Sequence, residues 1–470
     1  MDKIRVGVRV RPFNRREREL GTESVITMQN NNQCCIQAHN SSSSDKHYSR
    51  TKPGKVFTFD HCFDVEGDNS DQEAVYIAVG RGLLDNAFDG YNACILAYGQ
   101  TGSGKSYTMM GTENNKGLIP RLCDELFARI AALEQSDANT SCKVEVSFME
   151  LYNEKLNDLL DPSKDNRQAL KIREFNKGGI VVNGLCTLAV TSYVEIERLI
   201  KEGNAARTVA STNMNAESSR SHAVFNVLLT QTVVDVASGV SGAKVSKLSL
   251  VDLAGSERAS KTGAVGERLR EGSNINRSLS TLGLVISKLA ERDSFIPYRD
   301  SQLTLLLRDN LGGNSRTVMI ATISPSSDNY EETLSTLRYA NQAKRIVNNA
   351  VVNEDQNGKI IRELREEVDN LKGQLMSLQR KHTDGSGSVS VQEASINEKL
   401  HESEKLITNL SQTWEDKLKK TEQVQHERQQ ALEKMGISVQ TSGISVQKDK
   451  YYLVNLNADP SLNEMLVYYL

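Results

Sequence analysis

The first 350 residues alternate short apolar runs with polar segments. The run Ala93–Tyr98 is apolar throughout and predicts a buried strand, while Cys142–Phe148 alternates apolar and polar residues as a half-buried strand does. Stretches with helical spacing and short polar loops separate such runs. This alternation predicts an α/β domain that ends near residue 350.

Beyond residue 350 the apolar positions follow helical spacing. Intervals of three and four residues, kept for under three heptads, predict either a marginal coiled coil or an amphipathic helix packed on the domain. The residues on this seam are Ile361, Leu364, Val368, Leu371, Leu375 and Leu378. After a Gly-Ser hinge, a second helix is expected over residues 393–435. Its seam through Ile407, Leu410 and Trp414 changes phase at Leu418.

The chemistry of the sequence is concentrated at residues 99–106, which match the phosphate-loop pattern GxxxxGK followed by Ser or Thr. Glycines let backbone N–H groups approach a phosphate without a side chain in the way. Lys105 adds a positive charge for the outer phosphates, and the Ser106 hydroxyl can ligate magnesium. A strand before the segment and a helix after it favour a nucleotide site over a flexible turn. The expected phosphate-binding residues are Gly99, Gln100, Thr101, Gly102, Ser103, Gly104, Lys105 and Ser106.

Composition narrows the choice of partners. The chain has 57 basic and 60 acidic residues, so its net charge of -3 provides no general attraction to nucleic acid or to an anionic membrane. Apolar residues make up 38% of the chain, enough for a sizeable core, but no apolar run approaches the roughly 18 residues that span a bilayer. Its 7 cysteines lack CxxC pairs and zinc spacing, as is typical of reduced proteins. We therefore expect a cytoplasmic protein without nucleic-acid or membrane contact in this region.

Two further segments carry the chemistry of nucleotide switches. Residues 215–222 (NAESSRSH) gather hydroxyl and cationic donors, although a solvated serine loop has the same composition. Residues 247–257 (KLSLVDLAGSE) end an apolar strand at Asp252, whose carboxylate could reach magnesium through water. The N–H of Gly255 could sense a γ-phosphate. A GTPase is disfavoured, because the chain contains no Asn-Lys-x-Asp motif.

The phosphate loop, the SSRSH segment and the DLAGSE segment, in this chain order, resemble the kinesin motor domain. Further matching segments are FDGYNA (88–93), NINRSL (274–279), IPYRDS (296–301), LGGNS (311–315) and LRYA (337–340). The resemblance covers residues 1 to about 350. It implies the α/β fold of a P-loop NTPase, with a central, mostly parallel sheet flanked by helices and with ATP and Mg²⁺ at one edge.

The resemblance also implies roles for individual residues. Arg9, Arg11 and Pro12 would line the adenine side, where Tyr107 would stack on the base unless its ring packs in the core. Ser219 would join Ser106 at the magnesium ion. Arg220 and Glu257 would form an ion pair that closes the two switches around the attacking water. The expected catalytic residues are Asn215, Ser218, Ser219, Arg220, Asp252, Gly255 and Glu257.

The order of segments resembles plus-end-directed motors of the kinesin-3 family. The implied parts are a motor domain (1–343), a neck linker (344–358), a neck coil (359–382), a hinge (383–392), a first coiled coil (393–435) and the truncated start of a forkhead-associated domain (446–470). The track-facing element is expected from about Arg258 to Leu289. Implied partners are microtubules, a second copy through the neck coil, and a cargo adaptor bound by a tail beyond this chain.

One departure and one regulatory hypothesis accompany the resemblance. Kinesin-3 motors usually carry a lysine-rich insertion before the IPYRDS segment, whereas Leu289–Ile296 is short and nearly neutral. Electrostatic tethering to acidic tubulin tails is therefore in doubt. Across the hinge, the helix at 393–435 could fold back onto the neck coil or motor and keep the chain monomeric and inhibited. A modulator of microtubule ends and a nucleotide-locked scaffold are the alternative functions.

Overall fold

The computed structural model describes most of the chain, with several gaps. The described residues are 2–37, 54–65, 70–161, 170–175, 179–214, 218–234, 241–257, 267–353, 364, 367–374, 376, 396–405, 414–434, 452–454 and 467–469. Within them, a 9-stranded sheet forms the centre of the domain. Its strands, in spatial order, are β11 (Lys155–Asp158), β10 (Thr140–Tyr152), β15 (His222–Val234), β16 (Ser241–Asp252), β7 (Ala93–Tyr98), β17 (Arg316–Ile323), β2 (Arg5–Val10) and β6 (His61–Phe63), with β14 (Leu188–Val190) beside β10.

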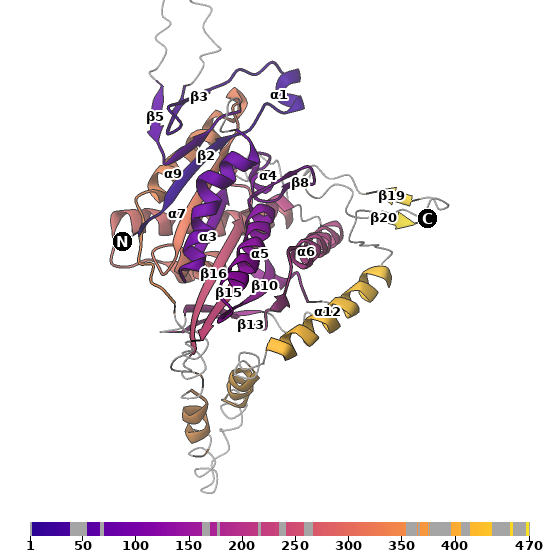
Figure 1. Ribbon diagram of the computed structural model, residues 1–470. Helices are drawn as coiled ribbons and strands as arrows, with labels where there is room; N and C mark the ends of the chain where they lie inside the picture. The colour runs from indigo at the N-terminus through magenta and orange to yellow at the C-terminus, as the bar shows by residue number, and fades with distance from the viewer. Residues whose placement is uncertain are drawn as a thin grey trace, which may run out of the picture.

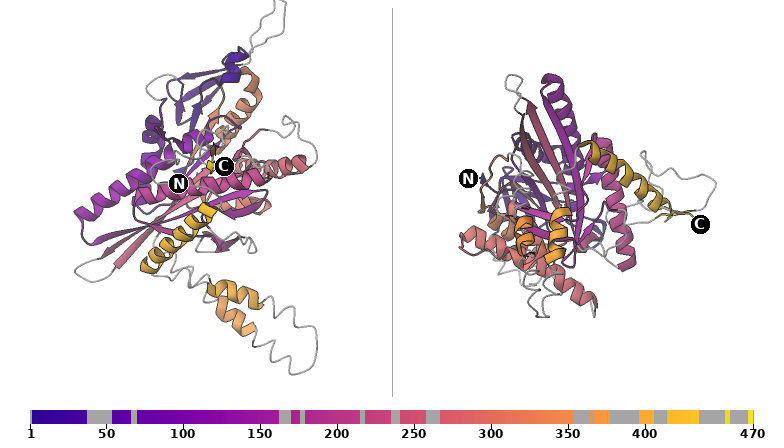
Figure 2. Two further views of the ribbon diagram at one scale, coloured as in Figure 1. Left: turned by 90° about the vertical axis from the view of Figure 1, so that its right-hand side faces the viewer. Right: turned by 90° about the horizontal axis from the view of Figure 1, so that it is seen from below.

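Helices cover both faces of this sheet (Figures 1 and 2). One face carries α3 (Arg81–Phe88), α5 (Leu118–Ser136) and α6 (Tyr193–Met214), and the other carries α7 (Glu267–Glu291), α8 (Gln302–Leu306) and α9 (Tyr330–Ala343). No helix in the described part of the chain is long and apolar enough to cross a membrane. The expected α/β architecture is therefore confirmed.

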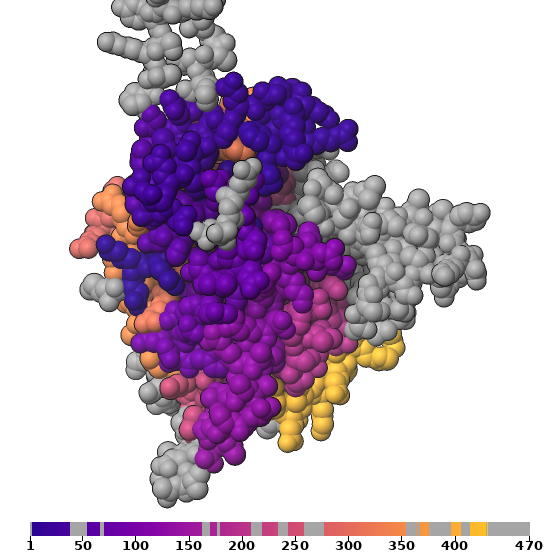
Figure 3. Space-filling view, turned by 45° about the horizontal axis from the view of Figure 1, so that its top comes forward, coloured from indigo at the N-terminus to yellow at the C-terminus, as the bar shows by residue number. Residues whose placement is uncertain are grey.

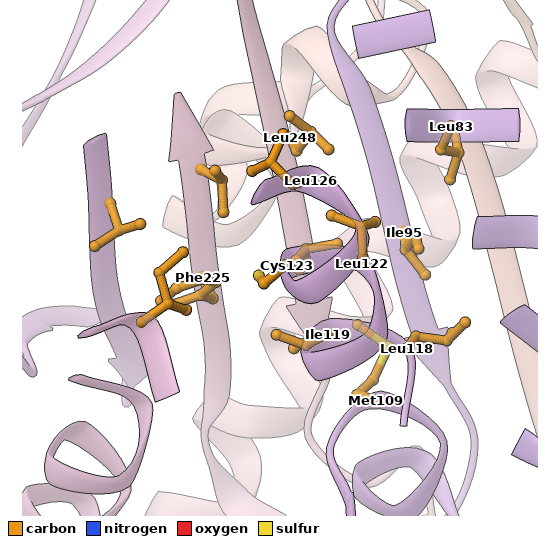
Figure 4. Close-up of a cluster of buried hydrophobic side chains, with 14 of the residues drawn as sticks. Leu83, Ile95, Met109, Leu118, Ile119, Leu122, Cys123, Leu126, Phe225 and Leu248 are labelled. Atoms are coloured by element: carbon orange, nitrogen blue, oxygen red, sulfur yellow. The ribbon is translucent and has the colours of Figure 1, made fainter. Parts of the chain in front are cut away.

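The two-sided cover explains why β7 is apolar throughout. Its alternate residues point to opposite faces, so Cys94 and Leu96 join the core under α7 and α9, while Ala93 and Ile95 join the core under α3 and α5. Figure 4 shows the second core, where Leu122 and other side chains of α5 point at the sheet.

The sheet is mixed. From β16 through β7, β17 and β2 to β6 the neighbouring strands are parallel, whereas β15, β10, β11 and β14 pair in antiparallel fashion. The reason lies in the connections. The chain goes directly from β10 to β11 through a tight turn at Asn153 and Glu154, both with positive φ, and strands joined in this way must be antiparallel.

The segment after α9 returns along the domain. Ile346 is buried, and β18 (Val347–Asn348) pairs with β1 (Asp2–Lys3). The Asn348 side chain is 1% exposed; it accepts from the Gly312 N–H at 2.8 Å and donates to the Ser315 carbonyl at 2.7 Å. Farther on, Asn353 accepts from the Asn314 amide at 2.7 Å. The segment predicted to be a neck linker is thus held along the motor domain up to residue 353.

A helix that follows the Gly-Ser hinge in the sequence lies on the α/β domain. This helix, α12 (Trp414–Lys434), packs against β14 and is drawn in yellow in Figures 1 and 3. Residues 367–374 and 396–405 form two further helical segments that lie side by side (Figure 2) and are joined by the pair Lys372–Glu404 at 3.1 Å. The last strands, β19 (Tyr452–Val454) and β20 (Val467–Tyr469), form an antiparallel pair. The forkhead-associated assignment stays a prediction.

Smaller elements complete the described chain. They are α1 (Arg15–Glu19), β3 (Ile26–Gln29), β4 (Gln33–Ile36), β5 (Lys55–Thr58), α2 (Gln72–Val75), η1 (Tyr76–Gly80), α4 (Lys105–Met109), β8 (Gly111–Thr112), β9 (Asn115–Lys116), β12 (Lys171–Phe175), β13 (Gly179–Asn183), η2 (Ser218–Arg220), η4 (Tyr298–Asp300), η5 (Arg308–Asn310) and η6 (Ser327–Asn329).

Candidate nucleotide site

The loop after β7 makes a tight turn and lies close to β17. Gly99, Gly102 and Gly104 have φ of +156°, +72° and +100°, in the region that favours glycine. A Cβ atom on Gly99 would lie 2.2 Å from the Thr322 carbonyl oxygen of β17, so only glycine fits at this position. The loop then enters α4 at Lys105. The strand, loop and helix predicted from the sequence are all present.

Lys105 lies inside this loop. Lys105 is 7% exposed, and its Nζ donates to the carbonyl oxygens of Gly99 at 2.9 Å and of Gln100 at 3.0 Å. A buried ammonium group needs such acceptors, because burial removes its hydration. The charge is thus fixed within the phosphate loop, as a phosphate-binding role requires.

Ser106 and Asp252 supply neighbouring oxygen atoms. The Ser106 hydroxyl donates to Oδ2 of Asp252 at 2.8 Å. Mg²⁺ prefers oxygen donors and usually keeps one or two protein ligands together with phosphate and water. Among the residues that the structure describes, no group of three or more His, Cys, Asp or Glu side chains could hold a metal by itself. The pair therefore fits a magnesium ion completed by nucleotide oxygens.

We call residues 215–222 the first switch and residues 247–257 the second switch. The end of the second switch contacts the phosphate loop. The N–H of Ser256 donates to the Gly99 carbonyl at 3.1 Å, and the N–H of Gly255 donates to the Ser219 carbonyl of the first switch at 2.8 Å. The Glu257 carboxylate accepts from the Thr101 N–H at 2.8 Å and from the Thr101 hydroxyl at 2.5 Å. A carboxylate thus lies on a backbone donor of the phosphate loop. The expected Glu257–Arg220 ion pair stays a prediction.

The expected adenine side is assembled from two elements. The Arg9 guanidinium lies 5.3 Å from the centre of the Tyr107 ring, and it donates to Gln72 at 2.8 Å. Tyr107 is 37% exposed, so its ring is not packed in the core and can stack on a base. Arg11 donates from Nε to the Gly102 carbonyl at 2.6 Å, which ties the end of β2 to the phosphate loop. Pro12 is exposed beside it.

Other predicted residues are only partly placed. Asn215 lies outside the described residues, and of Ser218 only the backbone, in η2, is described. The expected track-facing element is α7, while Arg258 and the rest of the preceding loop lie outside the described part. At its end, Lys288 pairs with Asp293 at 2.6 Å, so this charge is already neutralised in the short loop.

Sequence reasoning missed a buried histidine that joins both switches to α7. His222 Nδ1 accepts from the Ala254 N–H at 3.0 Å, so Nε2 carries the proton and donates to the Ser278 hydroxyl at 2.9 Å. Burial, with Arg207 and Lys105 nearby, lowers the pKa of His222 to about 3. The ring is therefore neutral. The SSRSH pattern contains this residue, but only the fold shows its two partners.

A second missed connection joins the phosphate loop to α9. The rings of Tyr98 and Tyr339 stack with centroids 4.0 Å apart and planes 6° apart, and Tyr98 directly precedes the loop. At the start of α9, the Gln100 amide donates to Asn329 at 2.9 Å. Because α9 leads into the segment that pairs with β1, the loop contacts the helix that precedes the predicted neck linker.

Comparison with known proteins places the site in a family. The family model described as the kinesin motor domain matches residues 9–346, and a second, described as kinesin-associated, matches residues 381–470. The mouse protein named Kinesin-like protein KIF13A is 61% identical over 479 residues, which cover 100% of this chain and 26% of the relative. The Caenorhabditis elegans Kinesin-like protein unc-104 is 48% identical over 499 residues, covering 100% of this chain and 31% of the relative.

Solved structures similar to this chain are also kinesins. A KIF14 dimer with AMP-PNP in complex with a microtubule has a TM-score of 0.68 and 46% identity, and the match covers 77% of this chain and 100% of that one. A fast kinesin has a TM-score of 0.66 and 42% identity, covering 75% of this chain and 94% of that one. The present chain spans about a quarter of the length of the curated relatives it matches, 26% for the mouse protein.

Acid should destabilise the fold through His222. The free imidazole binds a proton below its ordinary pKa of 6.5, whereas the buried ring binds one only near pH 3. Between these values the unfolded chain holds more protons, so the free energy of unfolding decreases by about 1.4 kcal/mol per pH unit as the pH falls. Urea unfolding of the wild type and His222→Gln between about pH 7 and about pH 5 measures this term. The variant should lose stability less steeply, and equal slopes would contradict the assignment.

Proposed function

The chain belongs to the kinesin family, in its kinesin-3 branch, and we propose that it is a microtubule-stimulated ATPase that moves toward microtubule plus ends. The observation that carries the proposal is the second switch, which lies on the phosphate loop with Asp252 bonded to Ser106 and Glu257 bonded to Thr101. His222, which binds Ala254 of the same switch and Ser278 of α7, connects this nucleotide site to α7, the helix expected to face the track.

In the proposed reaction the chain binds ATP and positions water. Lys105 and the loop N–H groups hold the phosphates, and Arg9 and Tyr107 hold the base. Ser106, Ser219 and, through water, Asp252 would hold a magnesium ion, which would neutralise phosphate charge. When the switches close, the Glu257 carboxylate leaves Thr101 and forms an ion pair with Arg220. This ion pair orients the attacking water toward the γ-phosphate. Asn215 and Ser218 of the first switch and Gly255 of the second complete the enclosure.

The nucleotide site is proposed to act on the neck linker through α9. The Tyr98–Tyr339 stack and the Gln100–Asn329 hydrogen bond connect α9 to the phosphate loop. A displacement of the loop would therefore also displace α9. The linker that follows α9 is seated through buried Asn348. A seated linker favours walking over the alternatives of end modulation or a locked scaffold, because it provides the tether through which an ATP cycle advances a second head.

We further propose that α12 inhibits the motor. Every third or fourth residue of α12 faces the domain: Trp414, Lys417, Thr421, Val424 and Arg428. Lys417 pairs with Glu145 at 2.7 Å, and Arg428 pairs with Glu202 at 3.0 Å. Arg428 and Glu202 are 5% and 6% exposed. Both pairs are therefore largely removed from water, which makes their geometry specific to this docking position.

The neck-coil seam is also covered within the single chain. Leu364, Val368 and Leu371 are 0%, 7% and 8% exposed. Beside them, residues 396–405 contact the motor through Glu402, which pairs with Lys171 of β12 at 2.8 Å. A seam that is buried inside one chain cannot pair with a second chain at the same time. The folded-back form is thus proposed to be monomeric, and its release would free the seam for homodimerisation.

The proposed function predicts directional movement. The chain should show phosphate release that microtubules accelerate, and single fluorescent molecules should move toward the plus ends of polarity-marked microtubules. Cargo adaptors, which a longer tail would bind, are not needed in this assay. Binding without movement, or movement toward minus ends, would contradict the proposal.

Glu257→Ala should separate binding from turnover. The variant retains Lys105 and therefore binds ATP and microtubules, but loss of the water-positioning carboxylate should reduce steady-state hydrolysis by about a hundredfold or more. Lys105→Ala should instead lose nucleotide affinity in a fluorescent-nucleotide titration. Glu291→Ala, at the exposed end of α7, is the matched carboxylate control. Normal phosphate release by Glu257→Ala would rule out this role.

Arg428→Ala should activate the motor. Removing one partner of a buried ion pair costs about 3–5 kcal/mol. Glu202 then keeps only Arg198, 4.0 Å away, so its buried charge is poorly compensated and α12 should leave its site. Microtubule-stimulated ATPase should then increase, and sedimentation should show more dimer. Lys419→Ala, on the exposed face of the same helix, should change neither. An inhibited, monomeric Arg428→Ala chain would count against inhibition by α12.

A further inference from the structure

Thr421 occupies the centre of the contact between α12 and the motor domain. Its hydroxyl oxygen accepts a hydrogen bond from the Ala189 N–H of β14 at 3.0 Å and donates one to the Lys417 carbonyl at 2.9 Å. Thr421 is 4% exposed. Ala189 pairs with Glu145 of β10 in the sheet, so the hydroxyl satisfies an N–H group on the other edge of β14.

The surroundings of Thr421 on the motor domain are acidic. Glu145 and Glu202 flank it through their pairs with Lys417 and Arg428. A phosphate on the hydroxyl would bring about 1.5 to 2 negative charges and three further oxygens into this contact. The Ala189 N–H lies at hydrogen-bond distance already, so there is no space for them. Docked α12 and phosphorylated Thr421 exclude each other.

The sequence before Thr421 has the charge pattern that basic-directed kinases read. Lys417, Lys419 and Lys420 precede the threonine by four, two and one residues. Lys419 and Lys420 are exposed, while Lys417 is held by Glu145. The threonine and one of its recognition residues therefore become available together, when α12 leaves the domain.

We propose that Thr421 is a phosphorylation site for a serine/threonine kinase that recognises basic residues, and that phosphorylation keeps α12 released. The inference rests on the proposed inhibition by α12 and names its regulation. In the transfer, the Thr421 oxygen forms a bond to the γ-phosphorus of the kinase's ATP, the bond from that phosphorus to the bridging oxygen breaks, and ADP leaves. The hydroxyl proton passes to the kinase's catalytic base.

Phosphorylation of the released form would prevent two contacts from forming again. It replaces the hydroxyl that binds Ala189, and it places an anion one helical turn after Lys417, which then pairs with the phosphate instead of Glu145. The kinase acts only on the released form, so it does not open the inhibited chain. It prevents reclosure of a chain that has already opened, and the modification therefore prolongs activity.

The test compares three chains of residues 1–470: the wild type, Arg428→Ala and Thr421→Val. Each is incubated with ATP and the catalytic subunit of the cyclic-AMP-dependent kinase, and mass spectrometry locates the phosphate. Thr421 should be modified on the order of a hundredfold faster in Arg428→Ala than in the wild type, because loss of a buried ion pair raises the open population by that factor. Thr421→Val should gain no phosphate in the peptide that covers α12. Absence of phosphate at Thr421 in Arg428→Ala would overturn the site.

Hydrogen exchange then measures docking. Peptides that cover β14 and α12 should exchange at least about tenfold faster in phosphorylated wild type and in Thr421→Glu than in the unmodified chain. Thr421→Val keeps the shape of the side chain and should exchange less fast than Thr421→Glu. Equal, slow exchange in the phosphorylated chain would overturn the proposal. Fast exchange without any rise in microtubule-stimulated ATPase would support the modification site and refute inhibition by α12.

Discussion

The parallel register between β7 and β16 is the constraint on which the nucleotide site depends. It pairs Asp252 with Ala97, so the strand that ends at Asp252 and the strand that leads into the phosphate loop finish at the same edge. A slip by one residue would turn Asp252 to the opposite face of the sheet, away from Ser106. The buried cores on both faces prevent such a slip, because each would have to accept the side chains of the other. The site is thus positioned by the packing of the whole sheet.

The loop geometry transmits this constraint. Since a Cβ atom at Gly99 would meet the Thr322 carbonyl, the loop is pressed against β17, and the second switch is pressed against the loop through Ser256 and Glu257. His222 connects the same switch to α7 through two hydrogen bonds of a neutral ring. These contacts form a continuous path from the phosphate loop to α7 and, through Tyr339, to α9. The proposed coupling between nucleotide and neck linker would use this path.

Much of the fold and of the site could be predicted from the sequence, and the limits have physical reasons. The phosphate loop and the Asp252 strand are local patterns, in which residue type and spacing determine conformation, and the structure contains the strands, loop and helix expected there. The phosphate- and magnesium-binding roles of their residues stay predictions. The roles of His222 and Tyr339 depend on contacts over long sequence separations, which no local spacing encodes. The antiparallel half of the sheet, where a mostly parallel sheet was expected, has a different cause, which is tight connections such as the turn at Asn153 and Glu154. In α12, the apolar seam changes phase at Leu418, and the residues that bind the motor domain are the polar Lys417, Thr421 and Arg428, which a search for apolar spacing does not find.

That polar seam has an energetic consequence. Burial raises the pKa of Glu202 and lowers the pKa of Arg428, so desolvation disfavours each charge. Their mutual pairing offsets part of this cost, together with the Leu159 carbonyl, which accepts from Arg428 at 3.1 Å, and Arg198, which lies 4.0 Å from Glu202. An apolar seam of the same size would bind the motor domain by excluding water. Because the hydrophobic effect is non-directional, such a seam would tolerate shifts of the helix along the domain. Paired charges and a single hydroxyl instead give docking that is specific in register and small in net free energy. Such a contact can be opened by changing one group, which an inhibitory helix requires and a permanent structural helix does not.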